Sequence, residues 1–141
     1  MLFGKRIRIV KRILVVEDEP LTAFDNEVLI EGAGYEVVGP CDNVADALAA
    51  LEGVDLILSD VKLSGKRSGL DLARAAGARG VPTLLVTGAC PDGAQDVAIG
   101  CLMKPYTDKV LKEAIKAVEQ HLGGGRPKLP KGLELFAGAP E

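Results

Sequence analysis

The chain has 141 residues, which suits one domain with its own core, and 48% of them are apolar while 26% are charged. A formal net charge of −3 provides no global basic field for nucleic acid or an anionic membrane, so we expect neither as a partner. No apolar run approaches the length of a membrane span, and we predict a cytoplasmic protein.

Short β-branched runs alternate with helical patterns, which is typical of βαβ units around a parallel sheet. Strands are expected at residues 12–16, 35–39, 55–59, 83–87 and 101–103. The first helix is predicted from Pro20 to about Gly32, with an apolar stripe of Phe24, Val28 and Leu29. Further helices follow Asn43, span residues 69–79, and follow Thr107. Five such repeats predict a doubly wound α/β fold of about three layers.

The ends of the chain differ in character from its middle. Residues 1–10 are predicted to form a basic arm, 11–122 the folded domain, and 123–141 a Gly/Pro-rich linker with a short tail. Leu133, Leu135 and Phe136 either pack back on the domain or contact a partner, although a frayed tail is the favoured interpretation.

Three cysteines, Cys41, Cys90 and Cys101, are present without a C-x-x-C spacing. We therefore expect small, buried or half-buried thiols in a reducing compartment.

Chemically informative residues stand where the predicted strands end. Glu17 and Asp18 follow the first strand, Asp60 the third, Thr87 closes the fourth and Lys104 follows the fifth. Because ligands of an open parallel sheet bind at the carboxyl ends of its strands, we expect these side chains to converge. Crowded carboxylates favour a hard divalent cation, above all Mg²⁺, and such an ion suits phosphoryl transfer to a carboxylate nucleophile.

The segments ILVVEDEP, DLILSDVKL, LLVTG and MKPY resemble the four signature segments of response-regulator receiver domains, over residues 12–121. The resemblance implies a (βα)5 flavodoxin-like fold with a five-stranded parallel sheet in the order 2-1-3-4-5. It implies that Asp60 is the phosphoacceptor, with Thr87 as the switch hydroxyl and Lys104 as the phosphoryl-binding lysine. The implied Mg²⁺ ligands are Glu17, Asp18, Asp60 and the backbone carbonyl of Lys62. A cis Lys104–Pro105 peptide bond is also implied.

The implied function is that of a single-domain response regulator in a two-component or phosphorelay system. A histidine kinase or histidine phosphotransfer protein would donate the phosphoryl group, and output would be by protein contact or phosphoryl relay. The protein would not be an enzyme, beyond its own aspartyl phosphorylation and dephosphorylation.

Three features depart from the common receiver pattern. Cys101 stands where an aromatic ring is usual, residues 88–100 leave room for only a short fourth helix, and the loop after Asp60 lacks the common proline. These features, with VPTLLVTG, also resemble the atypical FATGUY-type receivers of alphaproteobacteria.

Other interpretations remain open to different degrees. A pseudo-receiver would share the fold and serve only for docking. The presence of every residue type that phosphorylation needs argues against this interpretation. A haloacid-dehalogenase-type phosphatase needs D-x-D after the first strand, and a P-loop needs an upstream glycine, and neither motif is found. His121 is expected to be a solvated helix-end residue, and Lys66 and Arg67 to lie near the acceptor, where they would steer the phosphodonor.

Overall fold

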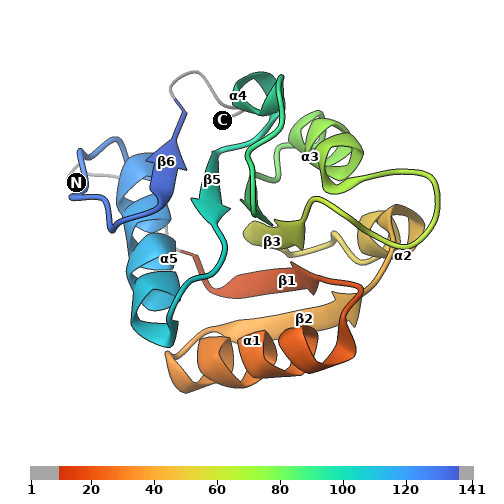
Figure 1. Cartoon of the computed structure of the whole chain (residues 1–141), viewed down its shortest axis with the longest axis horizontal. Coiled ribbons are helices and arrows are strands. Elements are labelled where there is room, and N and C mark those ends of the chain that lie inside the picture. The colour runs from red at the N-terminus through yellow and green to blue at the C-terminus, as the bar shows by residue number, and fades with distance from the viewer. Residues whose placement is uncertain (1–9, 137–141) are drawn as a thin grey trace.

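The computed structural model describes residues 10–136 of the chain (Figure 1). Its strands form one sheet in the order β2-β1-β3-β4-β5-β6. The strands are β1 (Arg12–Val16), β2 (Glu36–Cys41), β3 (Leu56–Asp60), β4 (Thr83–Thr87), β5 (Gly100–Met103) and β6 (Leu133–Leu135). The predicted order 2-1-3-4-5 is confirmed, and these five strands pair in parallel. The sixth strand, which was not predicted, joins β5 in antiparallel orientation.

The helices cover both faces of the sheet, which gives the predicted three layers (Figure 1). They are α1 (Pro20–Gly32), α2 (Val44–Ala49), α3 (Gly69–Gly77), α4 (Ala94–Val97) and α5 (Asp108–Leu122). One apolar cluster joins the sheet to α1 and α5, and two others join it to α2, α3 and α4. The fourth helix is short, as predicted. None of the helices within residues 10–136 combines the length and apolar character needed to cross a membrane.

Alternation along the central strands explains why both faces are apolar. In β1, Ile13 belongs to the cluster under α1 and α5, whereas Leu14 belongs to the cluster under α2 and α3. In β3, Leu56 belongs to the cluster under α1 and α5, and Ile57 belongs to the cluster under α2 and α3. Because successive side chains of a strand point to opposite faces, a central strand buried on both sides must be apolar throughout. The sheet therefore holds its strand ends, and whatever side chains follow them, in fixed relative positions.

Side-chain caps set the starts of three helices. The Asn43 side chain accepts a hydrogen bond from the backbone N–H of Asp46, and Thr107 accepts one from Val110. Ser68 and Asp71 form a reciprocal capping box at the start of α3. Asn43 and Thr107 begin their helices as predicted.

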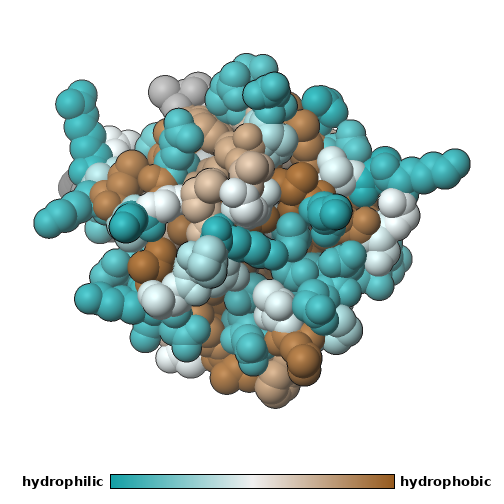
Figure 2. All heavy atoms as spheres, in the orientation of Figure 1, coloured by the Kyte–Doolittle hydropathy of each residue, from teal (hydrophilic) through white to brown (hydrophobic). Residues whose placement is uncertain are grey.

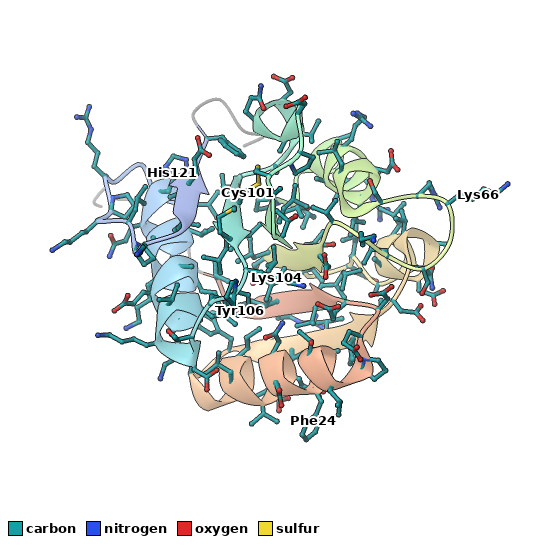
Figure 3. All side chains as sticks on the ribbon, in the orientation of Figure 1. Phe24, Lys66, Cys101, Lys104, Tyr106 and His121 are labelled. Carbon is teal, nitrogen blue, oxygen red and sulfur yellow. A yellow bond between two sulfur atoms is a disulfide. The ribbon has the colours of Figure 1, made fainter. Side chains whose placement is uncertain are left out.

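The predicted apolar stripe of α1 is wrong for two of its three residues. Phe24 and Val28 are 60% and 52% exposed, and Leu29 is half-buried against the core. The residues that α1 buries are Ala23, Asn26 and Ile30. The spacing of these residues places them on one helix face. The hydroxyl of Tyr106, in the segment between β5 and α5, donates to Oδ1 of Asn26 at 3.2 Å and so holds this face toward the interior. Phe24 therefore points away from the domain (Figure 3).

The C-terminal segment packs back on the domain, so the expectation of a frayed tail is wrong over its described part. Leu133 pairs with Leu102 of β5, and Phe136 is only 8% exposed. The predicted strand 35–39 also differs, because β2 runs two residues further. The basic arm predicted for residues 1–10 lies outside the described residues, apart from Val10, which is buried in the core.

Candidate functional site

The side chains of Asp60, Glu17 and Lys104 meet at the carboxyl ends of β3, β1 and β5. The Lys104 ammonium Nζ lies 2.7 Å from Oδ2 of Asp60 and 3.8 Å from Oε1 of Glu17. Figure 3 shows Lys104 just beyond β5, close to the middle of the sheet. The predicted convergence of these three residues is therefore observed. Such a site concentrates charge at a sheet edge where parallel strands leave room for a ligand.

Asp60 is held by backbone contacts as well as by Lys104. Its Oδ1 accepts a hydrogen bond from the N–H of Lys62 at 3.2 Å, and its side chain is 14% exposed. Gly69, the first residue of α3, packs on the backbone of Asp60 so tightly that any Cβ there would overlap the Asp60 carbonyl oxygen. The loop and the start of α3 thus fix the direction of this carboxylate. Gly69 was predicted only as the start of a helix, and its contact with Asp60 has no signal in the sequence.

Glu17 is buried, with 6% exposure, and its Oε2 accepts a hydrogen bond from the N–H of Glu19 at 3.1 Å. Burial raises the pKa of the Glu17 carboxyl, and the nearby charge of Asp60 raises it further. The next residue, Asp18, is exposed. The two acids line a cleft of about 450 Å³ between β1, α1 and the end of β2. Other residues lining it include Pro20, Phe24, Pro40 and Asp46.

Lys104 supplies the positive charge that this acidic group needs. Burial alone would lower the pKa of Lys104, but its hydrogen bond to Asp60 and the charges of Asp60 and Glu17 outweigh it and raise the pKa. The lysine is therefore an ammonium at neutral pH. We expected a divalent cation to balance these crowded carboxylates, and Lys104 is a second positive charge at the same edge, paired with two of them.

A metal ion is compatible with the donors at this edge, although they do not form a closed cage. Within residues 10–136, no three His, Cys, Asp or Glu side chains are grouped so as to hold a metal ion by themselves. Mg²⁺ asks for less, because it keeps several waters and is usually bound through one or two carboxylates together with phosphate oxygens. Glu17 and Asp60 provide two such carboxylates close together, since an oxygen of each contacts the ammonium group of Lys104.

Thr87 reaches the site through its backbone, while its hydroxyl faces the following loop. Its carbonyl accepts the N–H of Lys104 at 2.9 Å, which ties the ends of β4 and β5 together. The hydroxyl donates to the carbonyl of Ala89 at 2.9 Å and accepts the N–H of the same residue at 3.2 Å. The predicted switch hydroxyl therefore belongs to a residue that is bonded to Lys104 across β4 and β5, and the hydroxyl itself is paired with Ala89.

Two cysteines near the site are joined, which the sequence interpretation of three free thiols did not foresee. Cys90, in the loop after β4, forms a disulfide with Cys101 of β5. The third cysteine, Cys41, is free and half-buried. The two bonded residues come close only because β4 and β5 are neighbours in the sheet, a relationship that spacing alone does not reveal.

Of the remaining predictions, the one for the peptide bond before Pro105 is confirmed, and those for His121 and Lys66 are not. The Lys104–Pro105 peptide bond is cis, as predicted, and so is Gly39–Pro40. His121 was expected to be a solvated helix-end residue, but it is half-buried and its Nε2 lies 3.2 Å from the carbonyl oxygen of Phe136. Lys66 is exposed and extends outward from the loop before α3 (Figure 3), so a position beside Asp60 is not observed for it.

Comparison with known proteins gives a consistent result. The family profile described as the response regulator receiver domain matches residues 13–116. The chain is 31% identical over 117 residues to the transcriptional regulatory protein PdtaR of Mycobacterium tuberculosis, covering 77% of this chain and 55% of that protein. It is 42% identical over 62 residues to the phyllosphere-induced regulator PhyR of Methylorubrum extorquens, covering 42% of this chain and 23% of that protein. The chain thus spans about half, or less, of these relatives' length.

Solved structures with the same fold include two receivers at 28% identity. A CheY-like response regulator receiver domain protein from Methanospirillum hungatei has a TM-score of 0.72, covering 83% of this chain and all of that one. The response regulator protein TrrA from Thermotoga maritima, solved in complex with Mg²⁺-BeF, has a TM-score of 0.69, covering 77% of this chain and 98% of that one. With its sheet order and the match over residues 13–116, this chain belongs to the family of response regulator receiver domains.

Proposed function

We propose that this protein is a response regulator that accepts a phosphoryl group on Asp60 from a histidine kinase or a histidine phosphotransfer protein. The observation that carries the proposal is the 2.7 Å contact between Lys104 Nζ and Oδ2 of Asp60, beside the buried carboxyl of Glu17. A carboxylate held at a strand end and facing a cationic group is suited to nucleophilic attack on phosphorus. Output would follow by protein contact or by relay of the phosphoryl group.

The transfer can be written from the groups of this chain. An oxygen of Asp60 attacks the phosphorus of a phosphohistidine, and a P–O bond forms while the P–N bond breaks. The electron pair of the broken bond stays on the histidine nitrogen, and the released imidazole takes up a proton from solvent. Lys104 starts on Asp60 and needs only a small movement to contact a phosphoryl oxygen as a point charge. Thr87 must release the carbonyl of Ala89 before its hydroxyl can donate to another phosphoryl oxygen.

We propose Mg²⁺ as the cofactor of this reaction. Its protein ligands would be the carboxylates of Glu17, Asp18 and Asp60 and the backbone carbonyl of Lys62. When bound, the ion offsets negative charge on the phosphoryl oxygens. The support is the chemistry of the donors, all of which are hard oxygens at one sheet edge, and the position of Glu17 and Asp60, which direct oxygens toward one cationic group.

A docking surface for the phosphodonor lies beside the cleft. Leu21, Phe24 and Val28 of α1 are 76%, 60% and 52% exposed, and Phe24 also lines the cleft with Glu17 and Asp18. Figure 2 shows brown, apolar atoms along the lower edge of the molecule, where Figure 1 places α1. An exposed apolar stripe of this kind suits the face of a partner helix that presents its histidine to Asp60. The net charge of −3 gives no support for nucleic acid as a partner.

The test is phosphorylation by a small donor. The protein is incubated with phosphoramidate and Mg²⁺ and its intact mass is measured. We expect a gain of one phosphoryl group that survives acid and is lost in base, as an acyl phosphate should be. Asp60→Asn and EDTA should each abolish the gain, whereas Asp25→Asn, an exposed position on α1, should retain it.

An unmodified mass for the folded protein would support a second function, a pseudo-receiver that serves only for docking. The specific observations that favour this second function are the absence of an aromatic residue at Cys101 and the hydroxyl of Thr87 directed to Ala89. Two further proposals accompany the main one and stay predictions: a cytoplasmic location, where ATP-dependent kinases act, and membership of the FATGUY-type receivers.

A further inference from the structure

The disulfide between Cys90 and Cys101 has one reachable and one protected sulfur. Cys101 is 1% exposed within β5, whereas Cys90 is half-buried in the loop after β4. Figure 3 shows the yellow sulfur–sulfur bond beside β5 at the label of Cys101. Thiol–disulfide exchange begins when a thiolate reaches one sulfur, and the other sulfur then leaves. The exposure therefore selects Cys90 as the point of attack and Cys101 as the leaving group.

The bond closes the segment between two residues of the phosphorylation site. Cys90 follows Thr87 by three residues, and Cys101 precedes Lys104 by three. Thr87 and Lys104 are joined by the 2.9 Å backbone hydrogen bond between β4 and β5. The disulfide adds a second link, between the loop after β4 and β5, with a Cα–Cα distance of 6.1 Å. Residues 90–101, including all of α4, are thus a closed loop, and each of its ends is three residues from a residue of the site.

The end of this loop is fixed by the sheet, because Ile99 is buried and donates its N–H to the carbonyl of Thr83, whereas the part around α4 has weaker support. The helix α4 has four residues and begins at Gly93 without a side-chain cap, and such a short helix is unstable on its own. Its packing is limited to a small apolar cluster. The buried members of that cluster are Ala73, Leu85, Ala94, Ala98, Cys101 and Phe136. Cys101 is itself one of them, so the covalent bond and the packing act on the same residue. Breaking the bond should therefore change the freedom of the whole segment.

We propose that Cys90 and Cys101 form a reversible thiol–disulfide site that controls how readily Thr87 responds to phosphorylation of Asp60. The inference rests on the proposed function. In the oxidised form the loop holds the carbonyl of Ala89 on the hydroxyl of Thr87. In the reduced form the loop is released, and that hydroxyl becomes free to contact a phosphoryl oxygen. Disulfides in a reducing compartment are usually transient and redox-sensing, which agrees with such a role.

The chemistry balances with glutathione as the partner. To form the bond, the Cys90 thiolate attacks oxidised glutathione and one glutathione leaves, which gives a mixed disulfide. The Cys101 thiolate then attacks the sulfur of Cys90 and displaces the second glutathione. The two cysteines lose two electrons and two protons in total, and one glutathione disulfide becomes two glutathione thiols. A dithiol reductant reverses the process by attack on Cys90.

The redox site is tested without any phosphorylation. The folded protein is equilibrated with mixtures of oxidised and reduced glutathione, denatured in acid and alkylated with a maleimide, and its mass is measured. We expect one label under oxidising conditions, on Cys41, and three under reducing conditions, with full reversal by dithiothreitol. Three labels at every ratio, or one label that persists in dithiothreitol on the folded protein, would each overturn the proposal.

The coupling is tested by the rate of phosphoryl uptake from phosphoramidate. We expect oxidised wild-type protein to react severalfold more slowly than reduced protein. The Cys90→Ser variant should show one rate under both conditions, and Cys41→Ser should keep the ratio between them. Hydrogen exchange over residues 88–98 should be severalfold faster after reduction, while exchange in β1 should not change.

Equal rates of phosphoryl uptake in both redox states would refute the coupling. If neither state is phosphorylated, the proposed function and the coupling both fail, while the alkylation experiment still decides the redox site.

Discussion

Gly69 and Asp60 are in backbone contact, and the start of α3 rests on the peptide group of the proposed phosphoacceptor. The N–H of Gly69 donates to the carbonyl of Val61 at 2.7 Å, which holds the contact in place. Because a Cβ at position 69 would overlap the Asp60 carbonyl oxygen, only glycine fits without a shift of the loop or the helix.

The substitution Gly69→Ala should therefore affect both stability and function. We expect the free energy of unfolding to fall by about 1–3 kcal/mol, as for other overpacked positions, and phosphoryl uptake to slow because the carboxylate of Asp60 is displaced. Urea unfolding and intact mass measure the two effects. Gly32→Ala is the matched control, since a Cβ at this helical position has no atom within 4 Å and alanine favours a helix. Equal behaviour of the two variants would contradict the role of the contact.

Removal of the ammonium in Lys104→Met should separate metal binding from phosphorylation. Lys104 pairs with the carboxylates of Glu17 and Asp60 that would bind the ion, and a cation so near a second cation is repelled by roughly 1–2 kcal/mol even in water. We thus expect Mg²⁺ to bind about tenfold more tightly to this variant, while phosphoryl uptake is lost with the Lys104 point charge. Calorimetry in parallel with intact mass provides the measurement, and Lys112→Met, exposed on α5, is the control. Weaker Mg²⁺ binding by Lys104→Met would count against a metal site at Glu17 and Asp60.

The buried carboxyl of Glu17 makes stability depend on pH. Its pKa in the folded state lies above the ordinary value of 4.5, so the folded protein retains the proton after the unfolded chain has lost it. The contribution of Glu17 to the free energy of unfolding is therefore fully present below pH 4.5, and it is lost as the pH rises through the pKa of the folded state. In EDTA, Glu17→Gln should therefore be more stable than wild type at pH 7 and equal to it at pH 4. Denaturant unfolding at both values is the check, and a variant that is less stable at pH 7 would refute the prediction.

The substitution Phe136→Ala should destabilise the domain although it lies outside the five repeats. Phe136 is 8% exposed and packs in the cluster that contains Cys101 and Ala98. Truncation of a buried phenylalanine typically costs about 3 kcal/mol or more. Leu129→Ala, at a side chain that is 44% exposed, should change stability by less than about 0.5 kcal/mol. Urea unfolding compares the two, and similar small effects would show that the C-terminal segment contributes little.

The sequence predicted the parts of the fold that depend on repeated local patterns. The five parallel strands have strong apolar runs, and the order of Glu17, Asp60 and Lys104 at their ends led directly to their convergence. Asn43 and Thr107 could be predicted as caps because their side-chain oxygens accept hydrogen bonds from backbone N–H groups only three residues further along the chain.

The parts that were missed depend on tertiary contacts. Three residues of β6 carry no strand signal of their own, and they pair only because the edge of β5 is close by. The exposure of Phe24 follows from the rotation of α1, which Asn26 and Tyr106 fix from the interior. The sequence also could not show how near the Lys104 ammonium lies to the carboxylate of Asp60, because that distance depends on the packing of β5 against its neighbours.

The short antiparallel strand β6 also affects how the molecule meets others of its kind. It occupies the free side of β5, and Gly100 allows its backbone to approach closely at Glu134. The opposite border of the sheet is β2, where Pro40 offers no N–H and the pairing register with β1 shifts. One edge of the described sheet is therefore a strand of only three residues and the other edge contains a proline, and both features disfavour edge-to-edge pairing with a second copy.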